Sequence, residues 1–145
     1  MRILGIDYGE ARVGIAITDE LNITAQGIET IQRNGSDKVI LRRLDEILEK
    51  YNNVDTIVVG MPLNMNGTIS ERAKITEQFI HKLKCKYNKM KIDTIDERLT
   101  TVEAHKTMNF LNVNKNKKKN IVDTISAVYI LETYLNKFKN TLKNN

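Results

Sequence analysis

Short apolar runs separated by turn residues fill the first third of the chain. Ile3 to Asp7 and Val13 to Thr18 are two such runs with a tight connection between them, and Ile23 to Ile31 is a third. Runs of this length, rich in β-branched residues and bounded by polar turns, are typical of strands. We therefore expect three consecutive strands in an antiparallel meander.

The pattern changes to helical spacing after Ser36. Apolar side chains then recur every three or four residues until about Tyr51, which predicts a helix capped by the Ser36 hydroxyl. A buried strand, a second helix, a further strand and two more helices should follow. Their expected ranges are Val54 to Gly60, Ser70 to Tyr87, Lys91 to Asp96, Thr100 to about Leu111, and Ile121 to Phe138.

Length and composition narrow the class of protein. With 145 residues, the chain is expected to form a single domain over residues 1–145, with a frayed tail from about residue 140. A hydrophobic content of 41% is typical of a globular protein, and no apolar run approaches the roughly 18 residues of a membrane span. Cys85 is the only cysteine, so an intramolecular disulfide is excluded. We expect a cytoplasmic protein without a membrane segment.

Positive charge is concentrated in the second half of the chain. Residues 1–80 hold 9 Lys and Arg against 12 Asp and Glu, a net charge of −3, whereas residues 81–145 hold 14 against 6, a net charge of +8. Such an asymmetry favours a polyanionic partner, of which nucleic acid is the commonest. A merely lysine-rich, solvated surface explains many of the same residues. Charge is therefore supporting evidence only.

Asp7 is the first residue that suggests chemistry. An acid in a buried strand is unfavourable unless a cation neutralises it. Asp7 is followed by Gly9, and such an Asp-x-Gly sequence is also an ordinary signal for a hairpin turn. From this segment alone, a functional carboxylate and a simple turn are equally good interpretations.

Two other acidic positions make the functional interpretation stronger. Asp96 and Glu97 end the last predicted strand, and Asp123 lies near the start of the last predicted helix, on the side that should face the sheet. Carboxylates without His or Cys favour Mg²⁺ or Mn²⁺. Two such ions about 3.5 to 4 Å apart are suited to phosphodiester hydrolysis. Alternatively, Asp123 only complements the helix dipole.

Basic residues near these acids are candidates for phosphate contacts. Arg12 follows the first turn and Arg98 follows Glu97, and either guanidinium could hold a phosphate or pair with a neighbouring acid. The segment NVNKNKKKN is too polar to pack and reads as a loop. Its lysines are expected to contact backbone phosphates: Lys115, Lys117, Lys118 and Lys119.

Four stretches of the chain resemble, in order and spacing, the motifs of the YqgF family of Holliday-junction-resolvase-like proteins. These stretches are GIDYGEARVGIAITD, GMPLNMNG, DERLTT and KNIVDTISAVYIL. That family is associated with processing of the 16S ribosomal RNA precursor. The resemblance implies an α/β, ribonuclease-H-like fold. Its mixed five-stranded sheet has three antiparallel strands followed by two parallel ones, and about four helices flank it.

The resemblance also assigns roles to individual residues. It implies that Asp7, Glu97 and Asp123 are the catalytic, metal-binding acids, with Asp96 the less favoured choice in the DE pair. Ser126 stands where relatives usually carry alanine. The other positions that match the motifs are Gly5, Gly9, Arg12, Gly14, Gly60, Pro62, Gly67, Arg98 and Thr101.

Several functions are compatible with these features. The first is a Mg²⁺- or Mn²⁺-dependent nuclease that acts in 5′-end processing of the 16S ribosomal RNA precursor, with a DNA nuclease that resolves branched junctions as its close variant. The second is a non-catalytic RNA-binding factor in ribosome assembly or transcription. RNA is the favoured partner and branched DNA the alternative. Both a monomer and a homodimer fit, because resolvases that cut two strands symmetrically act as dimers.

Overall fold

The computed structural model describes residues 1–97 and 124–137. The first part contains three consecutive strands and then a helix, a strand, a helix and a strand, and one more helix forms the second part. They are β1 (Arg2–Tyr8), β2 (Arg12–Thr18), β3 (Ala25–Gln32), α1 (Asp37–Lys50), β4 (Val54–Met61), α2 (Glu71–Lys86), β5 (Lys91–Asp96) and a helix over residues 124–137.

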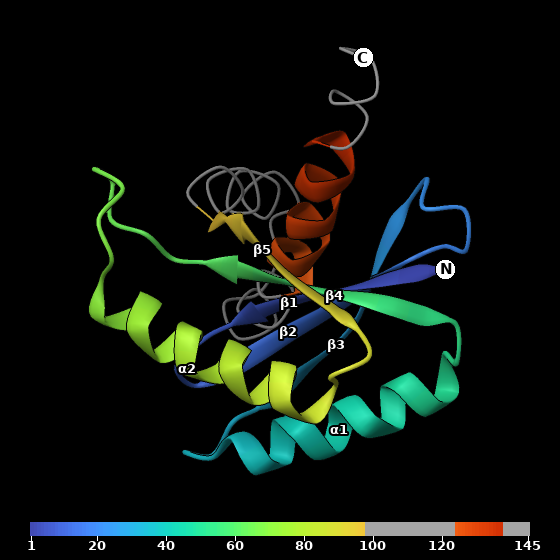
Figure 1. Ribbon diagram of the computed structural model, residues 1–145, viewed down its shortest axis with the longest axis horizontal. Helices are drawn as coiled ribbons and strands as arrows, with labels where there is room; N and C mark the ends of the chain where they lie inside the picture. Colours follow the sequence, from blue (N-terminus) through green and yellow to red (C-terminus); the bar gives the residue numbers. More distant parts are fainter. Residues whose placement is uncertain (98–123, 138–145) are drawn as a thin grey trace, which may run out of the picture.

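The five strands form one mixed sheet in the order β3-β2-β1-β4-β5. β1 pairs antiparallel with β2, and β2 pairs antiparallel with β3. β4 lies parallel to β1 and to β5, so the carboxyl ends of β1, β4 and β5 point to the same edge of the sheet (Figure 1). The predicted fold class is confirmed by this topology.

Local sequence signals account for the ends of the helices. Ser36 caps α1 by accepting a hydrogen bond from the Lys38 backbone N–H, and Ser70 caps α2 in the same way through the N–H of Ala73. Each cap satisfies one of the amide groups that a helix start leaves without an internal partner. Tyr51 and Tyr87 end the two helices, as the apolar spacing predicts.

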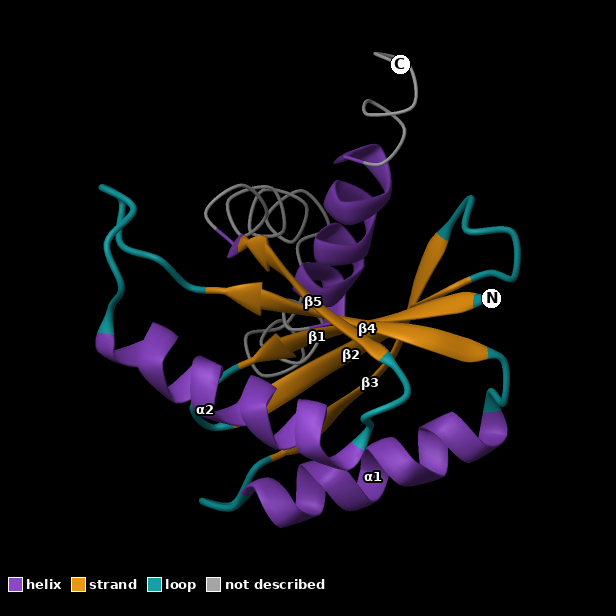
Figure 2. Ribbon diagram, in the orientation of Figure 1, coloured by secondary structure: helices purple, strands orange, loops and turns teal. Residues whose placement is uncertain are grey.

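Each face of the sheet has its own apolar core, because side chains alternate between the faces along every strand. Helices α1 and α2 cover one face, where Leu4, Ile6 and Tyr8 of β1 belong to the larger cluster. The helix over residues 124–137 covers the other face, with Ile130 and Leu131 fully buried. Figure 2 shows this arrangement of a sheet between helices.

Two details of the predicted elements change. The third strand begins at Ala25 rather than Ile23, whose side chain is 61% exposed in the preceding turn. The described residues contain three helices rather than four, and the helix expected over residues 100–111 lies outside them. The expected tail from residue 140 also lies outside. Over residues 1–97 and 124–137, no helix is long and apolar enough to cross a membrane.

Candidate active site

Asp7 lies in a row of residues that crosses the sheet with glycine on both sides. Gly14 of β2 is paired with Asp7, and Thr30 of β3 is paired with Gly14. On the other side, the register that pairs Ile6 with Val59 places Gly60 of β4 beside Asp7. The half-buried Asp7 therefore has no side chain at either neighbouring position of this row.

The carboxylate of Glu97 lies over the second of these glycines. A Cβ atom built on Gly60 would lie 3.3 Å from Glu97 Cδ and 2.7 Å from Ile130 Cδ1. Glu97 is therefore on the sheet face that the helix over residues 124–137 covers. Adjacent strands are about 4.8 Å apart, so Glu97 Cδ lies within roughly 8 Å of the Asp7 Cβ. The structure brings these two predicted acids together.

Asp96 leaves the strand from the other face. Along β5, Asp93 accepts a 2.8 Å hydrogen bond from the Tyr134 hydroxyl, and Ile95 belongs to the core beneath the same helix. Because side chains alternate between the two faces along a strand, the Asp96 side chain points away from that helix. The DE pair therefore presents one acid to each side of the sheet, and Glu97 is the one on the side of Asp7.

Asp123 lies outside the described residues, but the residue after it is placed. The Thr124 hydroxyl lies 3.0 Å from the Thr30 hydroxyl, and a Cβ on Gly27 would overlap Thr124 Cγ2 at 1.9 Å. Since Thr30 belongs to the row that contains Asp7, the helix begins above that row. Two small residues, Ser126 and Ala127, are buried where this helix packs against the sheet.

The acids at this end of the row are suited to a hard divalent cation. Asp7 and Glu97 offer only carboxylate oxygens, which are the ligands that Mg²⁺ and Mn²⁺ prefer. Within residues 1–97 and 124–137, no three His, Cys, Asp or Glu side chains form a group that could hold a metal. A complete site thus needs a ligand from elsewhere, as the prediction for Asp123 requires.

The turn after β1 carries the predicted motif residues Gly9 and Arg12. The Gly9 N–H donates a 2.9 Å hydrogen bond to the Arg12 carbonyl, and a Cβ on Gly9 would lie 2.5 Å from that oxygen, so only glycine closes this turn. Arg12 is half-buried and shares a sheet face with Gly14 and Asp7. Its guanidinium therefore belongs to the same side of the sheet as the acids.

The other predicted motif positions have structural roles. Gly5 lies beneath the helix over residues 124–137, because a Cβ there would lie 2.6 Å from Leu131 Cγ. The Pro62 carbonyl accepts a 2.9 Å hydrogen bond from the Ser70 hydroxyl, and Gly67 adopts a positive φ of 84° in the loop between them. The remaining candidates lie outside the described residues: Arg98, Thr101, Lys115, Lys117, Lys118 and Lys119.

Sequence reasoning missed a polar network beside the site. Buried Asp37 accepts hydrogen bonds from the Tyr8 hydroxyl, from Arg33 Nε at 3.1 Å and from Lys82 Nζ at 2.8 Å. Burial alone would raise the pKa of Asp37, but these hydrogen bonds outweigh it and hold the pKa below its ordinary value. The sequence signal was an acid in the first helical turn, which alone suggests only a dipole contact.

Comparison with known proteins identifies relatives over almost the whole chain. The family model described as RuvX, Holliday junction resolvase, matches residues 1–137. A protein of Ruminiclostridium cellulolyticum named "Putative pre-16S rRNA nuclease" is 50% identical over 143 residues, which is 99% of each chain. A protein of the same name from Acetivibrio thermocellus is 48% identical over 135 residues, which is 93% of this chain and 95% of that protein.

Solved structures share the fold at low sequence identity. The chain is similar to Thermus thermophilus RuvC in complex with a Holliday junction substrate, with a TM-score of 0.61 and 12% identity over 97% of this chain and 98% of that one. The fowlpox virus Holliday junction resolvase gives a TM-score of 0.57 at 16% identity, over 95% and 99% of the two chains. These likenesses support a ribonuclease-H-like fold.

Proposed function

Because the chain belongs to the RuvX family of Holliday-junction-resolvase-like proteins, the family that its motifs resemble, we propose that it is a nuclease that hydrolyses phosphodiester bonds in the 5′-end processing of the 16S ribosomal RNA precursor. The observation that supports the site assignment is the position of the Glu97 carboxylate over Gly60, the residue beside Asp7 in the sheet. Asp123, next to the helix start above the same row, is the proposed third acid.

The proposed site assigns distinct tasks to the chain's own residues. Asp7, Glu97 and Asp123 hold Mg²⁺ or Mn²⁺, which would supply an activated water and stabilise the leaving oxygen. Gly60 lets the Glu97 carboxylate lie close to the sheet, because a side chain at this position would collide with Ile130 and press on Glu97. We assign the orientation of a substrate phosphate to Arg12, on the same face, and to Arg98.

A comparison of wild type with Asp7→Asn tests this function. We expect wild type to cleave a 16S precursor RNA in the presence of Mg²⁺ or Mn²⁺, and the variant to lose cleavage while it keeps its circular dichroism spectrum and melting temperature. The amide retains the size of the carboxylate but not its charge, so metal binding is lost with little change in packing. Cleavage by Asp7→Asn at the wild-type rate would rule out the proposed site.

The same experiment separates the alternatives when three substrates are compared. Single-stranded RNA, the precursor RNA and a four-way DNA junction are each titrated with both metals. Preferential cleavage of the junction supports a DNA resolvase. Salt-sensitive RNA binding that is indifferent to metal and to Asp7→Asn, without cleavage by wild type, supports a non-catalytic binding factor.

A further inference from the structure

A shallow pocket lies at the same edge of the sheet as Asp7, but on the opposite face. Its lining includes Tyr8, Gly9 and Glu10 at the end of β1, together with Arg33 after β3 and Arg72 at the start of α2. Two guanidinium groups from separate elements thus meet at the residues that directly follow Asp7. Neither arginine belongs to the acid site.

Arg33 is held in place by three contacts. Its Nε donates to Asp37, its Nη1 donates to the Glu10 carbonyl at 3.3 Å, and its Cζ lies 5.2 Å from the centroid of the Tyr8 ring. The Tyr8 ring is in turn stacked on Phe79, with 4.2 Å between ring centroids. A guanidinium fixed in this way loses little further freedom when it binds an anion.

Arg72 is exposed and is positioned by a backbone group. Its Nη2 donates a 3.3 Å hydrogen bond to the Tyr8 carbonyl. In the part of the chain that the structure describes, no carboxylate forms an ion pair with Arg72, in contrast to Lys74 two residues further on, which pairs with Glu71. The charge of Arg72 is therefore available to a ligand.

The charge balance of the pocket favours an anion. Arg33 and Lys82 share the single carboxylate of Asp37, which leaves one positive charge, and Arg72 adds another. Glu10 in the pocket lining opposes one of them. Arg33, Arg72 and Lys82 counted against Asp37 and Glu10 give a net charge of +1, to which Lys82 contributes from outside the pocket lining. A phosphate is the anion whose oxygens match the fork of two arginines.

We propose that Arg33 and Arg72 form a second phosphate-binding subsite, which holds a backbone phosphate of the nucleic-acid strand that is cleaved at Asp7. This proposal rests on the proposed nuclease function. Consecutive Cα atoms are about 3.8 Å apart, so Arg72 Nη2 lies within roughly 10 Å of the Asp7 Cα. A strand that crosses the edge of the sheet over Gly9 passes from the acids on one face to the two arginines on the other.

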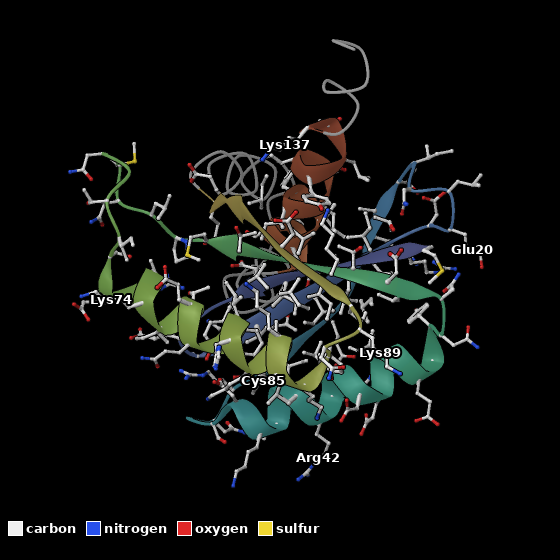
Figure 3. All side chains as sticks on the ribbon, in the orientation of Figure 1. Glu20, Arg42, Lys74, Cys85, Lys89 and Lys137 are labelled. Carbon is white, nitrogen blue, oxygen red and sulfur yellow. The ribbon has the colours of Figure 1, made fainter. Side chains whose placement is uncertain are left out.

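The test compares Arg72→Met with Arg42→Met. Both remove one exposed guanidinium, but Arg42 lies on the outer side of α1 (Figure 3) and is not among the residues that line the pocket. Binding of single-stranded RNA is measured without metal over a range of salt concentrations. We expect Arg72→Met to weaken binding and to make the slope of log K against log salt shallower by about 0.7, the value for one phosphate contact on a single strand. Equal slopes for the two variants would overturn the proposal.

Oligonucleotides with one neutral phosphate locate the phosphate that Arg72 contacts. In a series with one methylphosphonate at successive positions, wild type should lose affinity at one position, and Arg72→Met should be indifferent to that substitution. Arg33→Lys should be intermediate at the same position, because lysine keeps the positive charge but not the forked guanidinium. A profile shared by wild type and Arg72→Met would contradict the subsite. Cleavage by wild type is measured separately, so that loss of the nuclease function and loss of the subsite give different results.

Discussion

Glu97 and Asp96 are neighbours with the same charge, yet the fold gives them opposite sides of the sheet. We expect Glu97→Gln to reduce metal-dependent cleavage by more than roughly 100-fold, which exceeds the loss typical of a residue that only supports a metal ligand. Asp96→Asn should retain most of the wild-type kcat, because its side chain leaves β5 away from Asp7. The two variants are compared at saturating metal. An Asp96→Asn enzyme as inactive as Glu97→Gln would show that the strand alternation does not select the ligand.

Asp37 is a residue whose contribution to stability should depend on pH. Hydrogen bonds from Lys82, Tyr8 and Arg33 hold its pKa below the ordinary value despite burial. Its stabilising effect is therefore fully present above the unfolded pKa, about 3.9, and is lost as the pH falls through the folded pKa. We expect Asp37→Asn to lower the free energy of unfolding at pH 7 by about 1.5 to 3 kcal/mol.

This pH dependence is checked by urea unfolding of the wild type and of Asp37→Asn at pH 7 and at successive values below pH 4. The difference between the two proteins should shrink toward the acid end, because the protonated wild-type carboxyl loses the advantage that its charge provides. Other acids titrate in both proteins and cancel in the difference. A difference that stays constant with pH would contradict the charged role of Asp37.

At the level of elements, the sequence predicted what local chemistry controls. Ser36 caps its helix where expected, and β5 has the predicted bounds, because caps and apolar periodicity act over a few residues. The row that joins Asp7 to Gly14 and Gly60 could not be predicted in the same way. Strand register depends on pairing between segments far apart in sequence, so it emerged only with the whole sheet.

The contact between the last helix and β1 depends on Gly5. A Cβ at this position would lie 2.6 Å from Leu131 Cγ and 3.1 Å from the Ala127 carbonyl oxygen, and the backbone oxygen cannot move independently of its helix. We expect Gly5→Ala to destabilise the protein by about 1 to 3 kcal/mol, the range typical of overpacking. Because the helix starts beside Asp123, cleavage should fall as well.

Urea unfolding of Gly5→Ala, Leu131→Ala and the double variant measures this contact. Leu131→Ala alone should cost about 2 to 5 kcal/mol, because Leu131 is fully buried. Removing the leucine side chain also relieves the clash at Gly5, so the double variant should cost less than the sum of the single ones. Strict additivity would mean that the helix does not press on Gly5.

On the scale of the whole molecule, the order of the chain separates acidic from basic functions. The acids proposed to bind metal come from β1, from the residue after β5 and from the residue before the last helix, so the proposed site draws on three segments that are distant in sequence. The excess of positive charge lies mainly in residues 81–145. Nucleic acid is repelled by an acidic site alone, so the basic half of the chain must supply much of the attraction.

The lysines between residues 115 and 119 test how that attraction arises. Changing Lys115, Lys117, Lys118 and Lys119 together to Gln lowers the net charge from +5 to +1. For RNA binding, we expect the slope of log K against log salt to become shallower by roughly 0.7 for each lysine that contacts a phosphate. The kcat at saturating RNA should change little, since none of these residues belongs to the acid site.

A control protein with Lys38, Arg42, Lys84 and Lys89 changed to Gln has the same net charge, and all four side chains are exposed. If both proteins show the same slope, RNA responds to the overall field of the molecule and the lysine segment makes no contact of its own.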